Sequence, residues 1–231
     1  MKPPAIGGLR RFWMRQRFAF QRRHRRPVPG RFQPYPHTLP DRYPWLFASA
    51  AAHLEGIAAP RLLSFGCSRG DEVFSLRRVF PGAVIHGIDI DAGNIARCLA
   101  RTDRAASRQL TFKTAADTRD EPSTHYDALF CLAVLCHGDL AVSGARRADP
   151  LLHFEAFEAM VGDFARCLKP GGLLFLHTTS FRFRDTAGFA AFDTILEAEP
   201  HQLAPDPLFD RDNRLMPGER YLPVGFRKRR D

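Results

Sequence analysis

The sequence of 231 residues lacks the features of a secreted or membrane-spanning chain. No uninterrupted apolar stretch follows the N-terminus, so we expect no secretory signal. The longest apolar run, 128–136, has nine residues, too few to span a bilayer. The five cysteines are odd in number and contain no C-x-x-C pair. This pattern favours free thiols in a reducing compartment over a disulfide framework, and we expect a cytoplasmic protein without a transmembrane segment.

A metal centre is not expected either. Cys131, Cys136 and His137 are close in sequence, but they lie in an apolar segment without a matching second cluster of ligands. Buried cysteines in such a segment are more typical of core packing than of a metal site.

Acidic residues are absent from 1–31, which holds ten of the 34 Lys and Arg residues. Residues 227–230 add four more, which leaves 20 basic against 24 acidic residues between 32 and 226. The net charge of +9 therefore belongs to the ends of the chain. The arginines of 1–31 alternate with Phe and Trp, a pattern that suits phosphate contact and base stacking on RNA, or docking on an anionic membrane. The alternatives are a solubilising tail or a helix that folds over a binding site.

Alternating elements follow this basic arm. Six prolines between 27 and 44 indicate an extended strap, and a helix follows that ends near Gly56. From residue 61 onward, apolar runs typical of strands alternate with helical patterns. We predict strands over 61–65, 83–88, 110–114, 126–131 and 172–177, and helices over 70–79, 91–101 and 153–168. This order predicts a parallel sheet covered by helices on both faces.

The turn after the first strand has two interpretations. Gly66-Cys67-Ser68-Arg69-Gly70 fits G-x-S-x-G, the nucleophile elbow of hydrolases, and it also fits a small-residue loop around a cofactor. Asp89 ends the second strand nineteen residues after Gly70, where an acid can bind ribose hydroxyls. A hydrolase has no use for that acid, so the hydrolase hypothesis ranks last.

The acids that open the following helix narrow the choice of nucleoside. Asp71 and Glu72 would repel a pyrophosphate, and they complement the helix dipole themselves. A nucleoside with cationic groups is favoured. S-adenosylmethionine (SAM), with its ammonium and sulfonium, has these properties.

Four segments come in the order and approximate spacing of one family. LLSFGCSRGDEVFSL, HGIDID, YDALFCLAVLCH and LKPGGLLFLHTTS together resemble the class I SAM-dependent methyltransferases, over about residues 60–180. The first segment is similar to the cofactor loop of the chemotaxis-receptor methyltransferases. LFDRDNRLMPGERYLPVGFRK, residues 208–228, is similar to the family's closing strands. The resemblance implies a Rossmann-like, seven-stranded, mostly parallel sheet with one antiparallel C-terminal strand.

The resemblance also implies a set of cofactor-binding residues. The loop would surround the methionine part of SAM, Asp89 would bind the ribose, Ile90 and Asp117 would face the adenine, and the end of the fourth strand would wall the methyl-transfer site. The residues assigned in this way are Gly66, Cys67, Ser68, Gly70, Asp89, Ile90, Asp117, Cys131 and Leu132. Ser64 is a departure, because many members carry an acid there. The ammonium of SAM is then expected to contact carbonyls alone.

Catalytic groups are harder to assign, because displacement on a sulfonium needs mainly proximity and alignment. If the acceptor needs a base, His137 is the first candidate and His177 the second, although a histidine at such a place is more often structural than catalytic. We expect the strap to cover the pocket together with Phe181, Phe183, Phe189 and Phe192, although these aromatics could equally be core.

The predicted organisation is a basic arm (1–31), a strap with its lead-in helix (32–59) and a SAM-binding domain (60–231). The predicted function is methyl transfer to an unidentified acceptor. The alternative is an RNA- or anionic-surface-binding protein, possibly an RNA methyltransferase, that uses residues 1–31.

Overall fold

A computed structural model describes residues 30–102, 108–149, 151–204 and 206–230. The seven strands are β1 Arg61–Phe65, β2 Val84–Asp89, β3 Leu110–Thr114, β4 Tyr126–Leu132, β5 Leu168–His177, β6 Phe192–Glu197 and β7 Pro223–Lys228. The α-helices are α2 Pro44–His53, α3 Asp71–Val79, α4 Ala92–Arg101, α5 Gly138–Ser143 and α6 Phe154–Cys167. Two short 3-10 helices, η2 Phe183–Asp185 and η3 Ala187–Ala191, precede β6. The basic arm lies outside the described residues, apart from Gly30 and Arg31.

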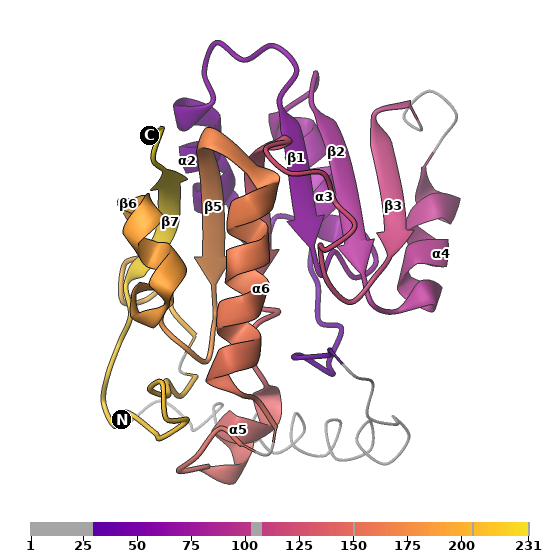
Figure 1. The fold of residues 1–231 in the computed structure, drawn as a ribbon. Coiled ribbons are helices and arrows are strands. Elements are labelled where there is room, and N and C mark those ends of the chain that lie inside the picture. Colours follow the sequence, from indigo (N-terminus) through magenta and orange to yellow (C-terminus); the bar gives the residue numbers. More distant parts are fainter. Residues whose placement is uncertain (1–29, 103–107, 150, 205, 231) are drawn as a thin grey trace, which may run out of the picture.

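The strands form one sheet in the order β3-β2-β1-β4-β5-β7-β6. Strands β1 to β5 pair in parallel, and β7 runs antiparallel to both of its neighbours, β5 and β6. In Figure 1 the arrowheads of β1, β2, β3 and β5 point to one end of the sheet, while β7 points to the other. The predicted fold, a mostly parallel Rossmann-like sheet with one antiparallel C-terminal strand, is confirmed.

Alternate side chains of the strands fill two cores, as expected for a sheet buried on both faces. Leu63 and Leu129 pack toward α6, which covers one face in Figure 1. Leu62 and Phe130 pack toward α2, α3 and α4 on the other face. The ring of Phe130 also stacks on Phe175, with centroids 5.0 Å apart. Both layers hold the central strands rigidly, and with them the loops at their carboxyl ends.

The predicted closing strands are only partly correct. Of residues 208–228, the last six form β7, whereas the other closing strand, β6, comes earlier, over Phe192–Glu197. Strand β6 lies at the edge of the sheet, and only Phe192 is buried along it. An edge strand with one buried side chain shows no apolar alternation in sequence.

The aromatic residues after β5 belong to the core. Phe181, Phe183 and Phe192 are buried in the cluster beneath α6, and Phe189 packs against it. Phe183 contacts three other rings edge-on, those of Phe189, Phe192 and Phe226. The expectation that these aromatics cover the pocket is therefore wrong, and the core interpretation is correct.

The strap, residues 30–43, crosses the carboxyl end of the sheet without forming a helix or strand. Tyr35 donates its hydroxyl to Asp139 Oδ1 (2.7 Å), and Gln33 Nε2 donates to Cys136 Sγ (3.2 Å). These contacts attach the strap to the segment that follows β4. No helix in the described ranges is long and apolar enough to cross a membrane.

Candidate functional site

The loop between β1 and α3 adopts a conformation that depends on small residues. Gly66 has φ of +75°, and a Cβ there would lie 2.3 Å from Val134 Cγ2. The amides of Gly66 and Cys67 both donate to the carbonyl of Ile88 (2.7 and 2.9 Å). The loop is thereby attached to the end of β2, and any side chain larger than hydrogen at Gly66 would force it away.

Asp89 fixes the other side of this loop. One carboxylate oxygen accepts the amide of Ser68 (2.8 Å), and the other accepts the amide of Asp91 (2.8 Å) and Asn94 Nδ2 (3.1 Å). Asp89 is 8% exposed. Because three donors hold the buried carboxylate, its position and orientation at the carboxyl end of β2 are fixed.

Ser68 lies in the left-handed region, with φ of +49°. Its hydroxyl is buried and has no hydrogen-bond partner among the described residues. A nucleophilic serine needs a base near its hydroxyl, and the described residues place none within hydrogen-bond distance of Ser68, which counts against the hydrolase interpretation. A buried hydroxyl without a partner is costly in a folded protein, and it marks a position where a ligand can supply the missing bond.

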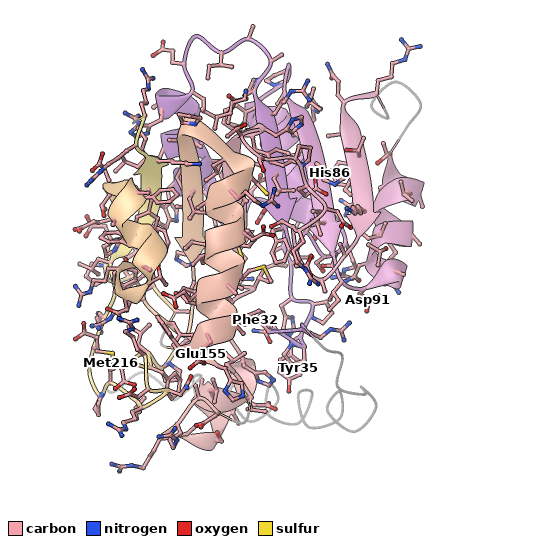
Figure 2. The ribbon with its side chains drawn as sticks, in the orientation of Figure 1. Phe32, Tyr35, His86, Asp91, Glu155 and Met216 are labelled. Atoms are coloured by element: carbon pink, nitrogen blue, oxygen red, sulfur yellow. The ribbon has the colours of Figure 1, made fainter. Side chains whose placement is uncertain are left out.

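A cavity lies between this loop and the strap, and we name it the loop cavity. Of the residues predicted to bind the cofactor, Gly66, Cys67, Ser68, Asp89, Ile90 and Leu132 line it. The strap supplies much of the opposite wall, from Gly30 to Tyr43. The strap thus covers this cavity, and its role over a cofactor pocket stays a prediction. In Figure 2, Phe32, Tyr35 and Asp91, all from this lining, lie at the same end of the sheet.

Three other predicted cofactor residues lie elsewhere. Gly70 ends the loop as the N-cap of α3, with Phe74 and Cys98 where its side chain would be. Asp117 pairs with Arg119 (2.6 Å) at the surface. Cys131 is fully buried in the core beneath α6, and burial raises the pKa of its thiol. The structure brings the other six assigned residues together in the cavity lining and leaves these three outside it.

The two candidate bases are both engaged in the structure, and neither lines the loop cavity. His137 caps α5, with Nδ1 accepting the amide of Asp139 (3.3 Å). His177 contacts the carbonyl of Gln202 through Nε2 (3.1 Å) and the hydroxyl of Thr178 through Nδ1 (2.8 Å). A carbonyl only accepts, so Nε2 carries the proton. Burial lowers the pKa of His177 to about 4, and its ring is therefore neutral at pH 7.

Glu72 is a charged residue of the cavity to which the sequence assigned only a helix-dipole role. It lines the loop cavity, and its Oε1 accepts the hydroxyl of Ser64 (2.7 Å). Burial raises the pKa of Glu72 to about 7. Many members of the family carry an acid at the position of Ser64. Here Ser64 instead donates a hydrogen bond to a carboxylate from α3. The signal was present in sequence, since β1, the loop and α3 are consecutive and bring Ser64 and Glu72 to one wall.

Arg42 supplies a positive charge from the strap. It lines the same cavity, where it acts electrostatically on Glu72 and lies over the ring of Tyr43 (5.0 Å). No sequence pattern indicates this residue, because its place depends on how the strap crosses the sheet. The cavity therefore presents three carboxylates, from Glu72, Asp89 and Asp91, and two guanidiniums. The second guanidinium, that of Arg31, pairs with Asp91 (3.8 Å). In the described part of the chain, no group of three or more potential metal ligands is found.

Comparison with known proteins finds one family that matches part of the chain. Residues 63–174 match the family model described as a methyltransferase domain. Among curated proteins no sequence matches the chain. Solved structures match at low identity. The YcgJ protein from Bacillus subtilis is 15% identical over 69% of this chain, with a TM-score of 0.43, and YjhP from E. coli is 19% identical over 69%, with a TM-score of 0.41. The plantazolicin methyltransferase BpumL in complex with S-adenosylhomocysteine is 15% identical over 58%, with a TM-score of 0.39. The alignments cover 55%, 54% and 47% of those chains, so this chain spans about half the length of these three structures.

Proposed function

We propose that the chain is a class I methyltransferase, that it uses SAM in the loop cavity, and that it transfers a methyl group to an acceptor bound beside it. The match of residues 63–174 to a methyltransferase-domain model supports this proposal. The observation that carries the proposal is the unpartnered, buried hydroxyl of Ser68. It lies in a cavity lined by a small-residue loop and three carboxylates. The family match and the polar groups of this cavity both support SAM as the ligand.

The residues of the cavity fit the charges of SAM. Glu72 is suited to the ammonium, and Arg42 to the carboxylate of the methionine part. Asp89 retains acceptor capacity for ribose hydroxyls beyond its three bonds. When bound, SAM would supply an activated methyl group. The protein would supply position, because the loop and the strap fix the ligand between rigid strand ends.

The assignment of His137 and His177 as bases stays a prediction, as do the roles of Gly70, Asp117 and Cys131. The domain division into 1–31, 32–59 and 60–231 is likewise part of this proposal. RNA or membrane contact through 1–31 has no structural observation in its favour and is not the function we propose.

The first prediction concerns Asp89. We expect Asp89→Asn to weaken binding of S-adenosylhomocysteine more than tenfold, because a charged acceptor to ribose hydroxyls contributes about 1.5–3 kcal/mol. Affinity is measured by calorimetry, together with the Tm of each protein without ligand. Asp120→Asn is the matched control, because Asp120 is a surface carboxylate, 84% exposed. Equal loss of affinity in both variants would contradict the assignment.

A further inference from the structure

A second cavity, which we name the lateral cavity, is formed by the end of β5, by α5 and by the irregular segment 200–224. Its volume of about 450 Å³ is that of a small-molecule site. The apolar residues that the segment contributes include Leu203, Pro207, Leu208, Leu215, Met216 and Val224. In Figure 2, Met216 marks this side of the lower end of α6, with Tyr35 and Phe32 on the other side.

The lateral cavity is separate from the loop cavity, and the two linings have no residue in common. Tyr43 lines the loop cavity, and its ring packs on that of His177 at 4.7 Å. The chain neighbours of His177, Leu176 and Thr178, line the lateral cavity. A ligand there would lie behind this pair of rings, so it could not take a methyl group directly from the loop cavity. Such a ligand would be neither the cofactor nor the methyl acceptor.

Asp206 gives the lateral cavity its chemical character. It lines the cavity, is partly buried, and forms no ion pair with any residue in the described ranges. Burial raises the pKa of Asp206, and attraction to Arg42 opposes this. The other carboxylate of the lining, Glu219, is already paired with Arg182 (2.9 Å) and Arg184 (3.3 Å).

The charge of Asp206 selects one class of occupant. The cation of the lining, Arg220, is exposed and is not among the groups that shift the pKa of Asp206. An unpaired carboxylate beside apolar side chains is unfavourable, and a cationic ligand would relieve the cost. A neutral alcohol would leave Asp206 without a counter-charge, and a carboxylate ligand would be repelled. An amine with an apolar body is therefore the complementary ligand.

Helix α5 lies between this cavity and the strap. Leu140 and Ala141 line the lateral cavity, while Asp139, in the first turn of the same helix, accepts the hydroxyl of Tyr35 (2.7 Å). The helix has six residues, and a helix of this length depends on tertiary contacts for its stability. A ligand packed against Leu140 and Ala141 would stabilise α5, and with it the carboxylate that the strap binds.

We propose that the lateral cavity is a regulatory site for an apolar amine, whose ammonium pairs with Asp206 and whose body packs against α5 and thereby holds the strap over the loop cavity. The inference goes beyond the proposed function, because this ligand is neither SAM nor the methyl acceptor. Its effect on the strap requires neither of them.

The binding test compares three ligands that share an aromatic body and differ in charge: 2-phenylethylamine, 2-phenylethanol and 3-phenylpropanoate. Their binding to the full chain is measured by ligand-observed NMR titration. We expect the amine to bind at least about tenfold more tightly than the alcohol, as for a charge-assisted hydrogen bond. Asp206→Asn should remove this preference and leave the affinity for the alcohol unchanged.

The effect on the strap is measured by hydrogen–deuterium exchange of the full chain without SAM. The amide of Tyr35 donates to Gln33 Oε1 (3.3 Å), and the amide of His37 donates to the carbonyl of Tyr35 (2.9 Å). We expect saturating 2-phenylethylamine to slow exchange at these amides by at least about fivefold, the lower end of typical coupling between two sites. Tyr35→Phe should still bind the amine and lose the slowing, because the bond to Asp139 is removed.

Asp212→Asn is the matched control, because Asp212 lies in the same segment, is 71% exposed and does not line the cavity. It should retain both the preference for the amine and the slower exchange. Equal affinities for the three ligands, preference for the carboxylate, no binding to the wild-type protein, or unchanged exchange of the strap with the amine bound would overturn the proposal. No step of this test uses S-adenosylhomocysteine, so a failure of the proposed function would be seen separately, in its own binding measurement.

Discussion

Glu72 links the stability of the protein to pH at the scale of one residue. Its pKa is raised from 4.5 to about 7 in the folded state. Between these values the folded state keeps a proton that the unfolded state loses, so the free energy of unfolding falls as pH rises through this window. We expect Glu72→Gln to be more stable than wild type at pH 8, with a difference that shrinks toward pH 5. Urea unfolding at the two pH values measures it, and a constant difference would contradict the assignment.

The same residue predicts proton release on binding. If Glu72 pairs with the ammonium of SAM, binding favours its ionised form and a proton leaves the protein near pH 7. We expect the binding enthalpy to differ between phosphate and Tris buffers for wild type. In Glu72→Gln the difference should be smaller. An unchanged buffer dependence would show that another group releases the proton.

These residues differ in how far the sequence could identify them. Asp89 was predictable, because its place follows from the spacing of one βαβ unit. Asp117 and Cys131 were assigned from the resemblance. In the structure Asp117 pairs with Arg119 and Cys131 packs in the core, and the resemblance indicates neither contact. The place of Arg42 depends on the path of a segment without secondary structure, which no periodicity encodes.

At the scale of elements, the strap is the part that can control access to the loop cavity. Tyr35 donates to the carboxylate of Asp139, a bond of a type that contributes about 1.5–3 kcal/mol. We expect Tyr35→Phe to increase the dissociation rate of S-adenosylhomocysteine by tenfold or more, because the strap would open more readily. Stopped-flow displacement measures the rate.

Tyr221→Phe is the control, because its hydroxyl accepts the amide of Arg184, away from the strap. If both variants release the ligand at the same rate, the strap does not limit access.

The elements themselves were largely predictable, since the central strands are continuous buried runs and the helices between them begin at clear signals such as Asp91, which caps α4. The short helix α5 and the edge strand β6 were not, because neither buries enough side chains to leave a pattern. The fold was predictable despite these two omissions, because four sequence segments come in the order and approximate spacing of one family.

At the scale of the whole molecule, the distribution of charge predicts the effect of a truncation. Removing residues 1–29 takes away nine Lys and Arg and no acid, which leaves 25 basic and 25 acidic residues. We expect the truncated protein to lose any affinity for RNA or anionic vesicles that the full chain has, because no net attraction remains. It should retain binding of S-adenosylhomocysteine. Filter binding and vesicle co-sedimentation measure the first effect, and loss of S-adenosylhomocysteine binding would instead show that the arm completes the cavity.

The central claim is that the loop cavity binds SAM, and isothermal titration calorimetry of the full chain with SAM tests it most directly. The account predicts one binding site per chain with a Kd on the order of micromolar, or about −8 kcal/mol. S-adenosylhomocysteine should compete for the same site. Absence of binding heat at several temperatures, from protein that still unfolds cooperatively, would contradict the claim.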